Sequence, residues 1–195
     1  MHAQTGFADL SSQRKRFTVD DVYQMMDVGI IEGHRFELID GDIIEKMAHN
    51  PPHAFSIGAV HKMLIGTAGF DRVRAQLPIR IEGVDKEFNE PQPDIAVVAR
   101  PDPHGFAKRH PSSSELTLVV EVSDSTLRGD LAVKHALYGR SSVPEYWVLD
   151  LNGRQLVVHR QATNGQYQEV VTLTKDQAVE FEGILLPVAK MLPPD

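Results

Sequence analysis

The chain has 195 residues, a formal net charge of −7 and no cysteine, and 42% of its residues are hydrophobic. This length and composition suit one globular domain with a substantial core and exclude a disordered, collagen-like or coiled-coil chain. The absence of cysteine excludes disulfides and thiolate metal sites and makes a reducing cytoplasm the default location. No apolar run is long enough to span a bilayer, and the acidic balance gives no support to a nucleic-acid partner, although a local basic surface matters more than the total charge.

Residues 1–16 are expected to form a flexible, solvated arm that ends in a basic run at residues 14–16. Thr18 and Asp21 then have the spacing of a capping box, with Asp in place of the usual Glu, and predict a helix of about ten residues. Gly29 or Gly33 is expected to end this helix. Its buried stripe is predicted to consist of Val22, Met25, Met26 and Ile30.

The next segments predict a hairpin followed by a longer helix. In "RFELIDGDIIEKM", two extended runs flank Asp40-Gly41, a dipeptide favoured in two-residue hairpin turns because both central positions require positive φ. In "PPHAFSIGAVHKMLIGTAG", proline at the start and glycine at the end are typical of a helix. The apolar face of this helix is predicted to consist of Ile57, Val60, Leu64 and Ile65.

The rest of the chain alternates between apolar strands and one helix. Strands are predicted at "RVRAQLPIRI", "PDIAVVA" and "LTLVVEVS", and a helix follows at residues 126–140. "EYWVLD" and "QLVVHR" are expected to form a hairpin around Asn152-Gly153, before strands near "YQEVVTL" and "AVEFEG". Because no repeat or linker interrupts residues 1–195, we expect one α/β domain with a mixed sheet, flanking α-helices and peripheral β-hairpins.

Two of the apolar strands each carry one acidic residue, Asp94 and Glu121. A carboxylate in such a place normally finds a partner, binds a metal or takes up a proton. If the two strands are neighbours in the sheet, they lie about 5 Å apart, and both acids can reach one Mg²⁺, which prefers oxygen ligands. Two alternatives stay open: Asp94 accepts backbone hydrogen bonds at a strand end, and Glu121 pairs with a buried Arg or Lys.

Lys134 lies on the apolar stripe of the helix at residues 126–140, not on its wet face. Its ammonium group is therefore expected to point at the strand ends beneath it, where it would balance the carboxylates and stabilise charge on a phosphoryl group. The alternatives are a lysine that extends to solvent and an ion pair with Asp130, four residues earlier. Glu37 lies between Phe36 and Leu38, and the alternating pattern predicts that it faces solvent.

The histidines offer a rival, zinc-binding site. His49 and His53 are four residues apart, and His104 and His110 lie in one loop. Neither pair has a third ligand with a structural reason to converge on it, so zinc is the weaker hypothesis.

Five segments carry a family resemblance: "RFELIDGDI", "PQPDIAVV", "LVVEVSDST", "DLAVKHALYGRSSV" and "PEYWVLD". They resemble, in this order, the Uma family of putative restriction endonucleases, a branch of the PD-(D/E)XK nuclease superfamily. The resemblance spans about residues 35–150. No single segment is specific, and it is their order that carries the resemblance. It implies a restriction-endonuclease-like core with a Mg²⁺ site at the strand ends, where Mn²⁺ is a possible substitute.

The resemblance also implies roles for individual residues. Asp94 matches the Asp of the PD motif, Glu121 matches the second acid, and Glu37 matches the upstream glutamate that helps to hold the metal. The superfamily pattern has lysine two residues after the second acid, where this chain has Ser123. Lys134 resembles that lysine displaced onto the following helix. Gln76 resembles a polar position found near such sites, with no role assigned.

The function implied is metal-dependent hydrolysis of phosphodiester bonds in DNA, by a homodimer if the protein follows its superfamily. The loops at residues 82–92 and 100–113 offer phosphate contacts or are simply solvated. The alternative function is a catalytically inactive nuclease-fold module that acts in nucleic-acid binding or protein assembly.

Overall fold

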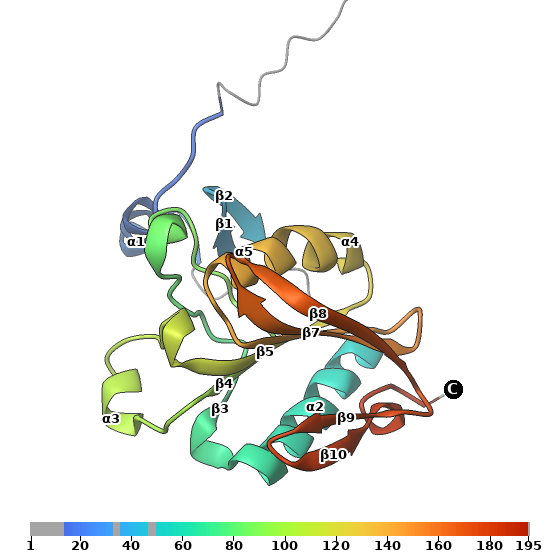
Figure 1. Ribbon diagram of the computed structural model, residues 1–195. Helices are drawn as coiled ribbons and strands as arrows, with labels where there is room; N and C mark the ends of the chain where they lie inside the picture. The colour runs from blue at the N-terminus through green and yellow to red at the C-terminus, as the bar shows by residue number, and fades with distance from the viewer. Residues whose placement is uncertain (1–13, 33–35, 47–49, 195) are drawn as a thin grey trace, which may run out of the picture.

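The computed structural model describes residues 14–32, 36–46 and 50–194. Its centre is a six-stranded mixed sheet with the strand order β3-β4-β5-β6-β7-β8 (Figure 1). Strands β5 and β6 are parallel, and the other neighbours in this sheet are antiparallel. The strands are β3 (Val73–Ala75), β4 (Ile95–Val98), β5 (Leu116–Ser123), β6 (Glu145–Asp150), β7 (Gln155–Thr163) and β8 (Gln166–Thr174).

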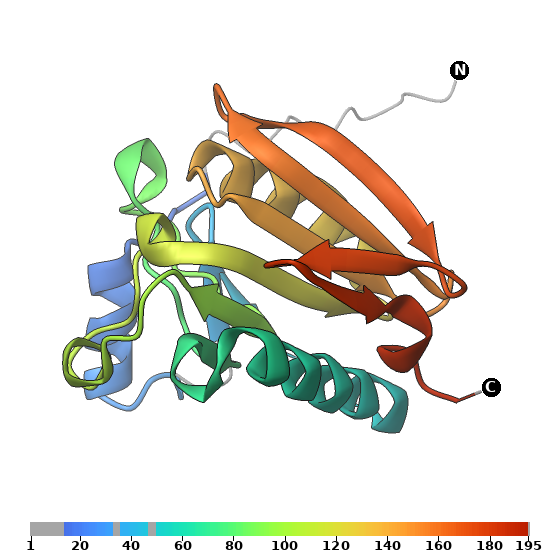
Figure 2. The same ribbon diagram turned by 60° about the horizontal axis from the view of Figure 1, so that its bottom comes forward.

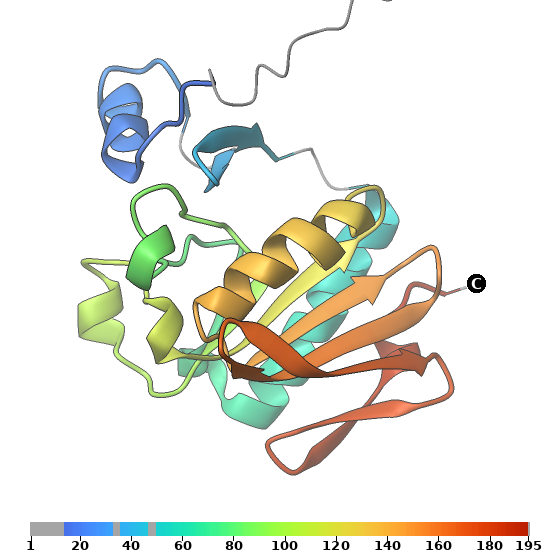
Figure 3. The same cartoon turned by 45° about the horizontal axis from the view of Figure 1, so that its top comes forward.

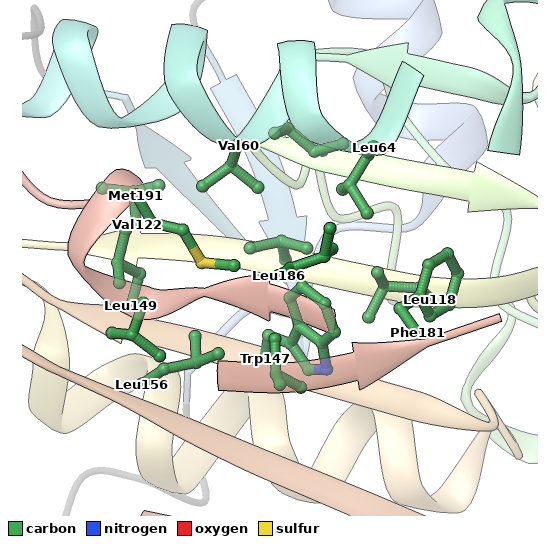
Figure 4. Packing of buried hydrophobic residues seen from close by; sticks show 14 of the residues in the cluster. Val60, Leu64, Leu118, Val122, Trp147, Leu149, Leu156, Phe181, Leu186 and Met191 are labelled. Atoms are coloured by element: carbon green, nitrogen blue, oxygen red, sulfur yellow. The ribbon is translucent and has the colours of Figure 1, made fainter. Parts of the chain in front are cut away.

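One face of the sheet is covered by α2 (Pro51–Ala68) and by the C-terminal hairpin of β9 (Ala178–Phe181) and β10 (Ile184–Pro187), as Figure 2 shows. In Figure 4, Val60 and Leu64 of α2 point toward the sheet and the hairpin, where Trp147 is fully buried. Truncating so large a side chain in a packed core costs about 3–5 kcal/mol. This layer therefore contributes much of the stability and fixes β4 and β5 in place.

The other face is covered by the helical connection between β5 and β6 (Figure 3). It consists of α4 (Leu127–Gly129), a π-helical turn η6 (Asp130–Lys134) and α5 (His135–Arg140). The helix predicted at residues 126–140 is thus confirmed, but with a π-turn in its middle. Such turns are rare and occur frequently at functional sites.

The N-terminal elements lie beside this second helical layer (Figure 3). They are α1 (Val19–Asp27) and the hairpin of β1 (Phe36–Ile39) and β2 (Asp42–Glu45). The capping box of Thr18 and Asp21 and the turn at Asp40-Gly41, with φ of 51° and 80°, are both confirmed. The predicted α/β architecture, a mixed sheet with flanking helices and peripheral hairpins, is confirmed as well.

Within the described residues, no helix is long and apolar enough to cross a membrane. Five short helical segments complete the described fold. These segments are η3 (Phe70–Arg72), η4 (Gly83–Asp85), α3 (Pro103–Phe106), η5 (Ser113–Glu115) and η7 (Val188–Lys190).

Three local predictions are wrong. The strand predicted at "RVRAQLPIRI" is only the three residues of β3, because Gln76 has a φ of 53° and turns the chain away from the sheet. In the predicted stripe of α1 only Val22 is buried, and Ile30 lies beyond the helix with 69% of its surface exposed. Arg14 and Arg16 are not part of a free arm, because they form ion pairs with Asp42 and Asp40 of the hairpin. Residues 1–13 of the expected arm lie outside the described residues.

Candidate active site

Asp94 directly precedes β4, and Glu121 lies on β5, its antiparallel neighbour, so the condition set for a shared cation is met. Ile95 of β4 pairs with Val120 of β5, and the same register continued by one residue places Asp94 opposite Glu121. The Val122 backbone N–H donates to Oδ2 of Asp94 at 2.8 Å. Both carboxylates are 3% exposed, so neither has the hydration that normally stabilises its charge.

Glu121 has two partners in the helical layer. The ammonium of Lys134 donates to Oε1 of Glu121 at 3.0 Å, and the hydroxyl of Tyr138 donates to the same oxygen at 3.2 Å. The pKa of Glu121 is raised to about 8, mainly by burial and further by the charges of Asp94 and Asp130. The ammonium of Lys134 lowers this pKa, but by less than the other effects raise it. Within the described residues, Oε2 of Glu121 accepts no hydrogen bond.

Lys134 points inward, as its place on the apolar stripe predicted. Its ammonium lies 3.0 Å from Oε1 of Glu37, 3.0 Å from Oε1 of Glu121 and 3.7 Å from Oδ1 of Asp130. Burial disfavours the charged form, but these three carboxylates raise the pKa of Lys134 above its usual value. The ion pair with Asp130 that was weighed as an alternative is thus present, together with the contacts to the two other acids.

Glu37 does not face solvent, so this prediction is wrong. The residue is 7% exposed, because the β1–β2 hairpin packs toward the helical layer and buries both faces of β1. Oε1 of Glu37 accepts from Lys134, and Oε2 accepts from the backbone N–H of Gln92 at 3.2 Å. A cavity of about 390 Å³ opens beside Glu37, with Gln76, Gln92 and His110 also in its lining.

Asp130 is a fourth buried acid in this cluster and was not predicted as a site residue. Its Oδ2 accepts hydrogen bonds from Ser123 Oγ at 2.6 Å and from Thr126 Oγ1 at 2.7 Å. Ser123, which stands where the superfamily pattern has lysine, therefore fixes an acid that in turn lies near Lys134. The spacing of four residues between Asp130 and Lys134 was the signal that could have identified it.

Among the described residues, the ammonium of Lys46 and the imidazole of His53 approach Asp94. Nζ of Lys46 lies 3.8 Å from Oδ1 of Asp94, and Nε2 of His53 lies 3.6 Å from Oδ2. Burial tends to raise the pKa of Asp94, but His53, Lys46 and the Val122 N–H together hold it below its usual value. The two strand acids thus have pKa values shifted in opposite directions, an arrangement typical of functional carboxylate pairs.

The other residues singled out in the sequence take no comparable part. Gln76 lies next to the site, and its backbone carbonyl oxygen accepts a hydrogen bond from Gln92 Nε2 at 3.0 Å. His49 lies outside the described residues, and His104 and His110 are not part of a metal cluster among those described. In the loop at residues 100–113, Arg109 pairs with Glu115 at 2.6 Å. A larger hollow of about 1030 Å³ is lined by this region and by residues 80–90, away from the buried acids.

The four buried acids fit a divalent cation in chemistry but not in their present arrangement. Among the described residues, no three acidic or histidine side chains converge with the geometry of a metal site, since Lys134 lies between Glu37 and Glu121. Carboxylate oxygens are the ligands that Mg²⁺ prefers. Within the described part of the chain, the four carboxylates are accompanied by two ammonium groups, Lys134 and Lys46, so carboxylates outnumber ammonium groups there.

Comparisons with known proteins agree with this architecture. The family model described as a putative restriction endonuclease, Uma2, matches residues 19–189. A solved structure of a putative nuclease belonging to DUF820, from Anabaena variabilis, is similar with a TM-score of 0.68 and 16% sequence identity. This match covers 90% of this chain and 97% of that one, and at such identity it shows the fold alone. No curated protein matches the chain. The family description supports a nuclease role.

Proposed function

The chain belongs to the Uma2 family of putative restriction endonucleases, and from this premise we propose that it is a metal-dependent endonuclease that hydrolyses phosphodiester bonds in DNA. The observation that carries the proposal is the pair of Asp94 and Glu121. These acids lie on adjacent buried strands, with the pKa of one lowered and that of the other raised to about 8. A divalent cation that replaced the proton of Glu121 would compensate the buried charge.

Asp94, through Oδ1, and Glu121, through Oε2, would hold such a cation. Within the described residues, Oε2 accepts no hydrogen bond, and the nearest cation to Oδ1 is Lys46 at 3.8 Å. Glu37 would assist them directly or through water, with its Oε2 held by the Gln92 N–H. When bound, Mg²⁺ or Mn²⁺ supplies the charge that polarises the scissile phosphate and lowers the pKa of a water molecule.

Lys134 is the proposed catalytic lysine. Its ammonium is held between Glu37 and Glu121, and in this place it would orient the attacking water or stabilise the charge that develops on the phosphoryl group. Because the π-turn η6 presents both Asp130 and Lys134 to the strand ends, the helix supplies the lysine that the strand lacks at Ser123.

A second candidate function is a catalytically inactive nuclease-fold module that binds nucleic acid or assembles with other proteins. One observation favours it: Lys134 already pairs with both Glu37 and Glu121, and the described acids are not arranged as a metal cage. In the nuclease proposal, Lys134 keeps its contact with Oε1 of Glu121, and the cation would use the other oxygen of that carboxylate together with Asp94.

A homodimer and a cytoplasmic location complete the proposal. The homodimer derives from the family resemblance, and it would allow both strands of a duplex to be cut. The cytoplasmic location derives from the absence of cysteine. Analytical ultracentrifugation with and without duplex DNA tests the dimer.

Nicking of supercoiled plasmid with Mg²⁺ or Mn²⁺ tests the proposed activity. The wild type and Asp71→Asn, which changes an exposed acid on η3, are expected to nick the plasmid. Asp94→Asn is expected to be inactive while it keeps the folded circular-dichroism spectrum. Metal-dependent nicking by Asp94→Asn would contradict the assignment, and a wild type that binds metal without nicking would direct the search to RNA or modified DNA.

A further inference from the structure

Among the described residues, two lysines contact the acid cluster, and they differ in how many hydrogen bonds they donate. Lys134 donates to two carboxylates at 3.0 Å, and its side chain is 11% exposed. Lys46, which directly follows β2, is 19% exposed and donates to the carbonyl oxygen of Gln92 at 2.5 Å. An ammonium group has three donors, and this is the single hydrogen bond of Lys46 to the described residues.

Lys46 lies on the Asp94 side of the acid cluster. Its Nζ lies 3.8 Å from Oδ1 of Asp94, beyond hydrogen-bond distance. Its charge lowers the pKa of Glu121 as well as that of Asp94, so its field reaches both strand acids. A phosphate drawn to a cation on these two acids would lie near an ammonium group that donates only one hydrogen bond to the described residues.

We infer that Lys46 is a further catalytic residue, which donates a hydrogen bond to a non-bridging oxygen of the scissile phosphodiester. The inference rests on the proposed nuclease function and assigns different tasks to the two lysines. Lys134 serves the acids and the attacking water, whereas Lys46 binds the substrate and stabilises the negative charge that grows on its oxygens. Charge-assisted hydrogen bonds of this kind are strong, and they gain strength in a site from which water is excluded.

The competing explanation is that Lys46 is only a counter-ion for Asp94. The two roles make different predictions, because a counter-ion acts on the acid and therefore on metal affinity. A substrate contact acts on duplex binding and on the rate of cleavage, while metal affinity stays the same or rises when the positive charge is removed.

The experiment compares Lys46→Met, Lys46→Gln and Lys46→Arg with the wild type and with Lys62→Met, which removes an exposed lysine on α2. Three quantities are measured: Mn²⁺ affinity by calorimetry, anisotropy of a fluorescein-labelled duplex with Ca²⁺, and the single-turnover nicking rate of plasmid with Mg²⁺. Two neutral replacements are used so that one that fails to fold does not end the test.

We expect the neutral variants to bind Mn²⁺ at least as tightly as the wild type, to bind the duplex more weakly and to nick about 10²-fold more slowly. Lys46→Arg should recover part of the rate, and Lys62→Met should behave as the wild type. Nicking at the wild-type rate by a folded neutral variant would overturn the role of Lys46. So would a loss of nicking that merely follows a loss of Mn²⁺ binding. A wild type that neither binds Mn²⁺ nor nicks would overturn the proposed function itself, and with it this role.

Discussion

The ammonium of Lys134 lies 3.0 Å from Oε1 of Glu121, and neither side chain has appreciable contact with solvent. A buried pair of this kind is costly to break, because the remaining charge has no water to stabilise it. Removal of Lys134, or binding of a cation to Glu121, should therefore change the free energy of unfolding.

Replacing Lys134 by methionine should lower the free energy of unfolding of the metal-free protein by about 3–5 kcal/mol, because Glu37 and Glu121 lose their shared cation. Added Mn²⁺ should restore more stability to this variant than to the wild type, since no ammonium competes for the carboxylates. Urea denaturation with and without Mn²⁺ measures both effects. Lys62→Met is the matched control, and equal stabilisation of the variant and the wild type by Mn²⁺ would argue against competition between Lys134 and a cation.

The stability of the metal-free protein should fall as the pH rises from about 5 to 8. The folded-state pKa of Glu121 is about 8, above the usual value of 4.5, so the folded protein binds more protons than the unfolded chain over this range. Stability therefore decreases with pH until Glu121 is ionised in both states. Glu121→Gln should remove this part of the slope in urea titrations at several pH values. An identical slope in the variant would show that another group is responsible.

Asp130→Asn should lower the pKa of Glu121, because the charge of Asp130 helps to raise it. Fewer protons should then leave the protein when a metal binds near pH 7. Calorimetric titration of Mn²⁺ in buffers of different ionisation enthalpy measures the number of protons released. Asp176→Asn, in an exposed turn before β9, is the control. An unchanged proton release would mean that Asp130 serves only to anchor Ser123 and Thr126.

Thr18→Ala should cost about 1 kcal/mol of stability, because Thr18 Oγ1 accepts from the Asp21 N–H at 3.0 Å and caps α1. Within the described residues α1 forms no hydrogen bond or ion pair with the four buried acids, so metal affinity should be unchanged. Thermal denaturation and Mn²⁺ calorimetry on the same samples test the two statements. A change in metal affinity would reveal a coupling between α1 and the site.

Local signals in the sequence predicted much of the fold. Asp40-Gly41 and Asn152-Gly153 marked turns, and proline followed by an apolar stripe marked α2. The strand at "RVRAQLPIRI" was predicted too long, because composition does not reveal that Gln76 adopts a left-handed backbone conformation. That residue is held by a tertiary contact, the hydrogen bond from its N–H to the Asp94 carbonyl oxygen.

Site residues could be predicted where the pattern within a single strand or helix marks them as unusual. Asp94 and Glu121 stood out as acids on apolar strands, and Lys134 stood out on an apolar stripe. Glu37 was predicted to face solvent because the alternation of apolar and polar residues identifies only one buried face of a strand. It does not reveal that a second layer packs on the opposite face, where Glu37 lies. Lys46 was missed because its partner Asp94 is far away in the sequence, and only the packed structure brings the two together.

The most direct test of the central claim is calorimetric titration of Mn²⁺ into the wild type and Glu121→Gln, with plasmid nicking read on the same samples. The account predicts that the wild type binds the ion and nicks, and that both properties are lost in a variant that stays folded. Binding of Mn²⁺ by Glu121→Gln with wild-type affinity would contradict it. So would a wild type that binds no ion, because Glu121 would then be satisfied by Lys134 alone.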